Sequence, residues 1–273
     1  QATEKQGPFF LYVAHAAPHW PLHALDQDIQ RYEKLYQQGW DEIRKKRFQK
    51  MKKEGIIPAT ASLSAKPNDI PEWRDVPDST KQDWAHRMAV YAAMVDRMDR
   101  GIGNIIEALR AEGQLENTYI FFLSDNGACA EDRLLLDRVF KINTSARPAG
   151  DSLSWQSYEA PWANVSNTPF RLYKSYLEEG GIATPFIAFH PKKIKAGTTS
   201  LYTGHVMDIM PTLIELSGIQ YPKQYNNNPV LKPEGNSLLP ALQQSKMLNN
   251  RLLFWEHERA KAVRYGDWKL VKQ

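Results

Sequence analysis

Residues 118–127 read TYIFFLSDNG, and this stretch decides the fold class. The uninterrupted apolar run from Tyr119 to Leu123 has polar neighbours at both ends, which predicts a buried strand. Strands that lack polar alternation are typical of mostly parallel sheets with helices on their faces. The polar Ser-Asp-Asn-Gly that follows therefore lies at the carboxyl end of a strand, where open α/β sheets bind their ligands. We expect an α/β protein with a site at this strand end.

A long amphipathic helix is predicted just before this strand. Apolar residues recur at alternating steps of four and three between residues 84 and 109, and Gly113 is a plausible stop. We expect this apolar stripe to pack in the core and assign it no chemical role; its members are Trp84, Met88, Tyr91, Val95, Met98, Ile102, Ile105 and Leu109. A helix followed by a strand in this order indicates a βαβ arrangement.

Apolar runs at residues 9–14 and 184–189 predict two further strands of the sheet, the first of them buried. Residues 26–54 are charged and helix-prone, and residues 207–216 predict a helix that ends at Gly218. Residues 252–271 predict short antiparallel strands around a Gly-Asp turn.

The connecting segments predict the domain organisation. Residues 56–80 and 127–170 are expected to be long loops. We assign residues 1–220 to an α/β domain, and residues 221–273 to a linker and the beginning of a smaller antiparallel subdomain. Polar residues 1–7 lead at once into the predicted strand 9–14, and the far end, Trp268-Lys-Leu-Val, stops inside a predicted strand. Both ends therefore look cut, and we expect a missing amino-terminal half of the same domain.

Composition narrows the class of protein. The chain has 273 residues, 42% of them apolar, and a net charge of +4, which is ordinary for a globular protein and too small to indicate a nucleic-acid partner. No apolar run of about 18 residues is present, so we expect no membrane span, and we recognise no signal peptide. Residues 44–53 hold seven Lys or Arg and favour a solvated helix face over a patch for anionic ligands. The single cysteine, Cys129, excludes an internal disulfide and a cysteine-based zinc site.

Three short segments carry candidate chemistry. Asp125 and Asn126 offer adjacent carboxylate and amide oxygens, which suit Ca²⁺ or Mg²⁺, although Asp-Asn-Gly alone is a common turn. His19 follows the predicted strand 9–14 and lies between Pro18 and Pro21, which stiffen its backbone; His15 and His23 are weaker candidates. Lys174 precedes Gly180-Gly181, a pair that indicates close backbone approach or a sharp turn, and it offers a compact positive charge for an anion.

In this order the segments resemble a known family. Phe9-Phe-Leu-Tyr with Pro18-His-Trp-Pro, then Phe121-Phe-Leu-Ser-Asp-Asn-Gly, then Lys174 with Glu179-Gly-Gly-Ile and Thr184-Pro-Phe-Ile resemble the later motifs of type I, formylglycine-dependent sulfatases. His205-Val-Met-Asp and Ala262-Val-Arg-Tyr-Gly-Asp-Trp resemble the family's following helix and carboxy-terminal strands. The resemblance covers nearly the whole chain.

The resemblance implies an alkaline phosphatase-like α/β fold and a sulfuric ester hydrolase that uses one Ca²⁺, with Mg²⁺ less expected. Asp125 and Asn126 would be metal ligands, Lys174 would contact the sulfate oxygens, and His19 would contact the sulfate or protonate the leaving oxygen. A periplasmic, secreted or lysosomal location follows from the resemblance alone. The substrate would be a sulfated small molecule or glycan.

The chain also departs from the family pattern. The Cys/Ser-x-Pro/Ala-x-Arg motif that supplies the formylglycine is absent, and Cys129 lies in a different context, Gly-Ala-Cys-Ala-Glu, so we assign it no catalytic role. The amino-terminal Asp pair that completes the metal site is also absent. We expect the formylglycine in the missing amino-terminal part, and we expect this chain alone to turn over no sulfate ester and to hold metal weakly.

Two alternatives stay open: a phosphate or phosphonate ester hydrolase of the same fold, and a non-catalytic protein that binds sulfated glycans. Trp20, Trp155 and Trp162 are candidates for sugar stacking, although packing is the more ordinary role. Three arginines are candidates for further acidic groups, and two asparagines lie in glycosylation sequons: Arg133, Arg138, Arg147, Asn143 and Asn164. The main interpretation requires His19, Lys174, Asp125 and Asn126 to surround one anion-sized space.

Overall fold

The computed structural model describes residues 7–132, 137–139, 141, 143, 147–243 and 250–273. The chain forms two compact units. The first consists of the described parts of residues 1–115 and 126–183, and the second of residues 116–125 and 184–273. This division by compactness differs from the assignment of 1–220 and 221–273 to two domains, which stays a prediction.

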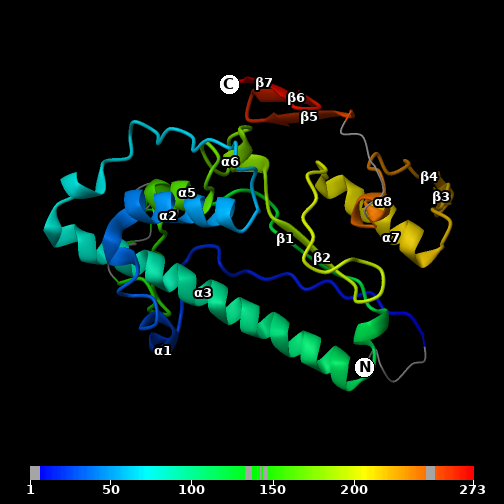
Figure 1. Ribbon diagram of the computed structural model, residues 1–273, viewed down its shortest axis with the longest axis horizontal. Coiled ribbons are helices and arrows are strands. Elements are labelled where there is room, and N and C mark those ends of the chain that lie inside the picture. The colour runs from blue at the N-terminus through cyan, green and yellow to red at the C-terminus, as the bar shows by residue number, and fades with distance from the viewer. Residues whose placement is uncertain (1–6, 133–136, 140, 142, 144–146, 244–249) are drawn as a thin grey trace. The chain divides into compact units, whose positions relative to one another are not determined.

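The first unit is built mainly from helices (Figure 1). They are α1 (Asp26–Ile29), the 3₁₀ turn η1 (Tyr36–Gln38), α2 (Gly39–Lys53), the 3₁₀ turn η2 (Trp73–Asp75), α3 (Asp78–Ala111), α5 (Glu159–Ser166) and α6 (Glu179–Ile182). Helix α3 begins directly after Pro77 and carries Asp78 in its first turn, where a negative charge favours the helix dipole. Gly113 follows the helix with a φ of +65°, as a stop residue should.

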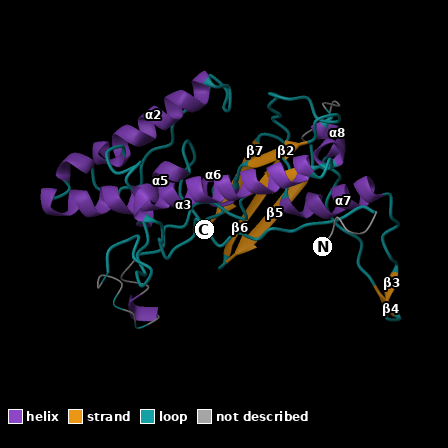
Figure 2. Ribbon diagram, turned by 90° about the horizontal axis from the view of Figure 1, so that it is seen from below, coloured by secondary structure: helices purple, strands orange, loops and turns teal. Residues whose placement is uncertain are grey.

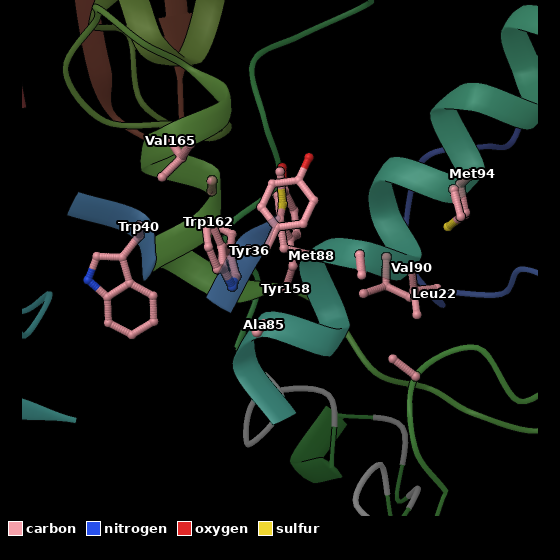
Figure 3. Close-up of a cluster of buried hydrophobic side chains, with 14 of the residues drawn as sticks. Leu22, Tyr36, Trp40, Ala85, Met88, Val90, Met94, Tyr158, Trp162 and Val165 are labelled. Carbon is pink, nitrogen blue, oxygen red and sulfur yellow. The ribbon is translucent and has the colours of Figure 1, made fainter. Parts of the chain in front are cut away.

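The core of the first unit lies between α2, α3 and α5 (Figure 3). Trp162 is completely buried, lies edge-on to Trp40 at 5.8 Å between ring centroids, and donates its Nε1–H to the carbonyl of Trp84. Met88 of the predicted stripe belongs to this core, and Trp84 and Tyr91 pack against it. All members of the stripe are buried or half-buried. Full burial is confined to the first half of the helix, where small side chains such as Ala89 and Ala93 allow close packing.

The predicted buried strand at residues 9–14 is wrong. The segment has no strand pairing, and Phe10 and Tyr12 are 74% and 80% exposed. A strand requires a hydrogen-bonded neighbour, and the part of the chain that the structure describes supplies none to this segment. The apolar run predicted burial, but pairing depends on other segments of chain.

All strands among the described residues belong to the second unit, where Figure 2 shows them in orange. The 3₁₀ turn η3 (Leu115–Asn117) leads into β1 (Ile120–Leu123), which pairs with β2 (Phe186–Phe189). The pair is antiparallel, with Ile120 opposite Phe189, whereas the apolar runs predicted parallel neighbours. Strand β1 is half-buried and β2 is mostly exposed, so the burial that the two apolar runs predicted is not found among the described residues.

The remaining elements of the second unit include the helix and the antiparallel strands that the sequence predicted. Its elements are β3 (Gln224–Tyr225), β4 (Asn228–Pro229), the 3₁₀ turn η5 (Val206–Asp208), α7 (Ile209–Ser217), α8 (Leu239–Leu242), β5 (Leu252–His257), β6 (Ala260–Tyr265) and β7 (Trp268–Lys272). Helix α7 ends at Gly218, which has the expected left-handed φ of 67°. Strands β5, β6 and β7 form an antiparallel sheet, which confirms the predicted small antiparallel element.

Two further expectations need correction. Residues 127–170 are not only a loop, since α5 lies within them. That helix also buries Asn164, which is 1% exposed, so its sequon is closed to a glycan in the folded chain. No helix in the described ranges is both long and apolar enough to cross a membrane.

Candidate functional site

A set of backbone contacts joins the segment after Asn126 to the glycine pair before β2. The amide of Gly127 donates to the carbonyl of Gly181 at 2.8 Å, and the amide of Gly180 donates to the carbonyl of Arg171 at 2.9 Å. A Cβ on Gly127 would lie 1.8 Å from the carbonyl oxygen of Gly180, and one on Gly181 would lie 1.9 Å from that of Tyr176. These positions require glycine because the backbones touch, as the sequence predicted for Gly180-Gly181.

Lys174 is held at the same place. Its amide donates to the carbonyl of Ala128 at 3.0 Å, and Asn167 binds the amide of Ala128 through its side-chain oxygen at 3.0 Å. Asn167 also donates to the carbonyl of Leu172 at 2.9 Å. The loop that carries Lys174 and the segment after Gly127 are therefore tied together over several residues.

His19 reaches this place from a turn near the start of the chain. Its amide donates to the carbonyl of Ala16 at 3.1 Å, and the fully buried Leu22 anchors the far end of the turn through its amide, which donates to the carbonyl of Gln156. The imidazole Nε2 lies 3.4 Å from Nζ of Lys174. The structure thus brings together the two residues that the sequence analysis assigned to the anion.

The tautomer of His19 follows from its second contact. Nδ1 lies 2.7 Å from the carbonyl oxygen of Trp20, and since a carbonyl oxygen only accepts, Nδ1 carries the proton. In the neutral ring, Nε2 therefore presents a lone pair toward the Lys174 ammonium. An imidazole held by a carbonyl in this way is fixed in orientation and ready to accept a proton or another cation at Nε2.

Glu131 completes the cluster, and sequence reasoning missed it. Its carboxylate accepts from Nζ of Lys174 at 3.2 Å and from the indole Nε1 of Trp20, and its backbone carbonyl accepts from the Ser157 hydroxyl at 2.7 Å. The residue lies in Cys129-Ala-Glu131, where no spacing signals a function. Contact with a lysine 43 residues away could not be read from the sequence.

Charge within the cluster is nearly balanced. Burial alone would raise the pKa of the Glu131 carboxyl, but the hydrogen bond and charge of Lys174, together with the Trp20 donor, outweigh it and hold this pKa below its usual range. Glu131 is therefore an anion near neutral pH and neutralises Lys174. The two side chains are 32% and 31% exposed, so an incoming anion can reach them.

The two predicted metal ligands fall on different units. Asn126 belongs to the first unit and directly precedes Gly127, which is bonded to Gly181, whereas the exposed Asp125 belongs to the second unit. His19, Lys174 and the segment that begins at Asn126 lie in one unit. The metal-ligand assignment of Asp125 and Asn126 stays a prediction.

The other sequence candidates divide by location. Trp162 is a core residue, so sugar stacking is wrong for it. Trp20, which donates to Glu131, and the 40% exposed Trp155 lie with ring centroids 6.4 Å apart. His15 is exposed, and His23 bonds to the carbonyl of Ser154 at 2.7 Å, a structural contact.

The arginine candidates and the sequon residue Asn143 lie at exposed positions or outside the residues that the structure describes. Arg138 and Asn143 are exposed, and Arg147 pairs with Asp151 at 3.2 Å. Arg133 lies outside the described residues. None of these contacts indicates a role in the site.

Comparison with known proteins decides the family. The family model described as "Sulfatase" matches residues 1–219, which is most of the chain. The chain belongs to the sulfatase family. A resemblance based on His19, the Ser-Asp-Asn-Gly segment, Lys174 and the glycine pair is thereby confirmed at the level of the family.

Two curated relatives of the chain are sulfatases as well. The sulfatase chain is 35% identical over 256 residues to an arylsulfatase of Klebsiella aerogenes, covering 92% of the chain and 55% of that protein. It is 33% identical over 283 residues to an uncharacterized sulfatase of Schizosaccharomyces pombe, covering 98% of the chain and 50% of that protein. The chain thus spans about half the length of these relatives.

A solved structure supports the fold. The crystal structure of Ps i-CgsB in complex with k-i-k-neocarrahexaose matches with a TM-score of 0.60 at 24% identity, covering 100% of this chain and 43% of that one. At this identity the likeness shows the fold alone. The sulfatase chain has the α/β, alkaline phosphatase-like fold expected from its sequence, with a small antiparallel sheet at its carboxy-terminal end.

Proposed function

We propose that the protein to which this chain belongs hydrolyses sulfate esters, and that His19 and Lys174 bind the sulfate group. The observation that carries the proposal is the 3.4 Å approach of Lys174 Nζ to His19 Nε2 across 155 residues of sequence. An ammonium and an imidazole that becomes a donor once Nε2 is protonated, this close together at an accessible place held by backbone contacts, suit a tetrahedral anion better than a structural role. Family membership and the 35% identity to an arylsulfatase support the same conclusion.

In this proposal Lys174 binds the sulfate oxygens. Its ammonium carries three donors on a compact charge, and in the absence of substrate two of its neighbours are His19 Nε2 and Glu131 Oε1. A sulfate oxygen can replace the weaker 3.4 Å contact and bring Lys174 closer to the reacting group. The ammonium then stabilises charge that develops on the sulfate oxygens.

In this proposal His19 protonates the leaving oxygen. Its Nδ1 proton is fixed on the Trp20 carbonyl, so only Nε2 exchanges protons with a ligand. Once Nε2 is protonated, the imidazolium donates that proton to the oxygen as the bond to sulfur breaks, and it returns to the tautomer seen here. This is general acid catalysis, which typically contributes about 10²–10⁴-fold to the rate.

The remaining chemistry requires groups beyond these two residues. Ca²⁺, held in part through oxygens of Asp125 and Asn126, would supply Lewis-acid polarisation of the sulfate, and Mg²⁺ is the second choice. Both donors are hard oxygens, which fits either ion, although two ligands are few against the roughly six to eight that Ca²⁺ takes. A formylglycine in the amino-terminal part of the protein would supply the nucleophile.

The chain alone is proposed to be inactive because no Cys/Ser-x-Pro/Ala-x-Arg segment occurs in its 273 residues. Purified residues 1–273 should show background hydrolysis only and weak Ca²⁺ binding, measured with an aryl sulfate and by calorimetric titration. Turnover by this chain alone would refute that part of the proposal.

Full-length protein tests the main proposal. Aryl sulfate and sulfated monosaccharides should be hydrolysed, and His19→Ala and Lys174→Ala should each lower kcat/KM by at least about 10²-fold. His257→Ala and Lys261→Ala are matched controls at exposed positions of strands β5 and β6 and should retain wild-type activity. Preference for phosphate or phosphonate esters would favour the first alternative, and binding of sulfated glycans without turnover would favour the second.

A further inference from the structure

Three metal-binding side chains converge within the site. Ligand atoms of His19, Cys129 and Glu131 all lie within 4.8 Å of one another, and all three residues belong to the first unit. Within the described part of the chain, this is the one group of three or more His, Cys, Asp or Glu side chains that comes so close. His19 lies more than 100 residues before Cys129 and Glu131, which are two residues apart, so no metal-binding spacing motif predicts the set.

Each of the three ligands is held in place by other contacts. The Trp20 carbonyl fixes the proton of His19 on Nδ1 and leaves Nε2 as the ligand atom, an arrangement typical of metal-bound histidines. The backbone of Glu131 is anchored by Ser157, and that of Ala128 by Asn167 and Lys174. Cys129 lies between these two anchored residues, so its sulfur is confined to the same place.

The donor set identifies the class of metal. One thiolate sulfur, one imidazole nitrogen and one carboxylate oxygen suit a borderline-soft ion such as Zn²⁺, whereas Ca²⁺ takes oxygen ligands only. We propose that His19, Cys129 and Glu131 form a Zn²⁺ site with three protein ligands and one open position. This site differs in residues and in chemistry from the oxygen site assigned to Asp125 and Asn126.

The proposed zinc site excludes substrate. Zinc on Nε2 of His19 occupies the lone pair that faces Lys174, and its charge repels the ammonium, which lies 3.4 Å from His19 and 3.2 Å from Glu131. Lys174 must move away and His19 can no longer carry a proton at Nε2. Zinc and the sulfate ester therefore compete for the same residues, a consequence that rests on the proposed function.

Cobalt provides a direct test of metal binding that does not depend on activity. Co²⁺ is titrated into metal-free full-length protein with Ca²⁺ restored, and the thiolate-to-cobalt absorption band is recorded. The band should appear in the wild type and in the control His257→Ala, and it should be absent from Cys129→Ser. A missing wild-type band, or a band that persists in Cys129→Ser, would overturn the proposal.

A second variant, Glu131→Gln, tests the metal site even if Cys129→Ser fails to fold. Glu131→Gln keeps the shape of the side chain and should weaken cobalt affinity by at least about tenfold, since even partners of metal ligands cost that much. Circular dichroism and the midpoint of thermal unfolding should match those of the wild type. Unchanged cobalt affinity in a folded Glu131→Gln would also contradict the site.

Inhibition then tests the competition. Zn²⁺ should raise the apparent KM for the sulfate ester in the wild type, whereas Cys129→Ser should keep its basal activity and become at least about tenfold less sensitive to zinc. Equal inhibition of both proteins would refute an inhibitory site at Cys129. If no sulfate ester is hydrolysed at all, the proposed function fails, and the cobalt band still decides the metal site.

Discussion

The amide of Gly127 donates a 2.8 Å hydrogen bond to the carbonyl of Gly181. This contact joins the Ser-Asp-Asn-Gly segment to the Glu-Gly-Gly segment, 54 residues later, at a distance that leaves no room for a side chain on either glycine. The positions of Lys174 and of the chain leading to Glu131 depend on this backbone contact.

Gly181→Ala is expected to lower the free energy of unfolding by about 1–3 kcal/mol, because its Cβ would lie 1.9 Å from the Tyr176 carbonyl oxygen. Gly103→Ala is the matched control. Apart from its chain neighbours and the backbone of its own helix, no atom lies within 4 Å of its added Cβ, and alanine within helix α3 should raise stability by about 0.5–1 kcal/mol. Urea unfolding measures both changes, and similar values for the two variants would contradict the close-contact interpretation.

Glu131→Gln is expected to tighten the binding of inorganic sulfate by about fivefold, because the carboxylate that competes for Lys174 loses its charge. The pKa of Glu131 is lowered, so the carboxyl stays ionised above its usual value of about 4.3, and the gain should be constant from about pH 5 to pH 8. Below about pH 4 the difference should shrink as the wild-type carboxyl is protonated. Isothermal titration calorimetry of the wild type and Glu131→Gln measures the two sulfate affinities, and Glu107→Gln, at an exposed position, is the control. Weaker sulfate binding by Glu131→Gln would show that the carboxylate positions Lys174 and does not compete with sulfate for it.

Asp28 should make the first unit sensitive to acid. It is 1% exposed and pairs with Arg100 and Arg97, each at 2.6 Å, and the hydrogen bond from Arg100 is the main reason that its pKa is lowered. A lowered pKa in the folded state means that this carboxylate stabilises the fold above its unfolded value of about 3.9 and loses that effect as the pH falls further.

Asp28→Asn should therefore unfold at lower urea concentration than the wild type at pH 7, and the gap should narrow toward pH 2. Asp99 is an exposed residue of α3, the helix that carries Arg97 and Arg100, and Asp99→Asn should unfold at the same urea concentration as the wild type at both pH values. A gap that does not depend on pH would mean that packing, and not charge, accounts for the effect of the substitution.

Trp162→Ala is expected to cost about 3–5 kcal/mol of stability, since the ring is fully buried among aromatic neighbours and its indole N–H is bonded to Trp84. Trp268→Ala removes a ring that is 85% exposed and should change stability by no more than about 0.5 kcal/mol. Chemical unfolding followed by far-ultraviolet circular dichroism compares the two variants, and a small effect of Trp162→Ala would contradict the central place of this ring in the core.

The spacing of apolar residues, and the glycines that end helices or form turns, predicted the elements that depend on local sequence. The apolar stripe from Trp84 to Leu109 predicted helix α3, and Gly218 predicted the end of α7. Gly266-Asp267 predicted the turn between β6 and β7. In each case the signal lies within one helix or one hairpin, and neighbours along the chain supply most of the hydrogen bonds.

Elements that depend on distant partners were predicted less well. The apolar run at residues 9–14 indicated burial, yet Phe10 and Tyr12 are exposed because no strand pairs with them in the described chain. The direction of the β1–β2 pair could not be read from two apolar runs. The site shows the same division: flanking prolines and glycines pointed to His19 and Lys174, whereas Glu131 and Cys129 join them only through contacts made in three dimensions.

The aromatic core described above has an optical consequence. Trp40 lies edge-on to Trp73, Trp84 and Trp162 with ring centroids 4.7, 5.7 and 5.8 Å apart, and all four indoles belong to the first unit. Indoles packed so closely couple their electronic transitions and should produce an intense near-ultraviolet circular dichroism signal. That signal would act as an intrinsic probe of the helical unit alone, and it would distinguish the melting of that unit from the fraying of the carboxy-terminal strands.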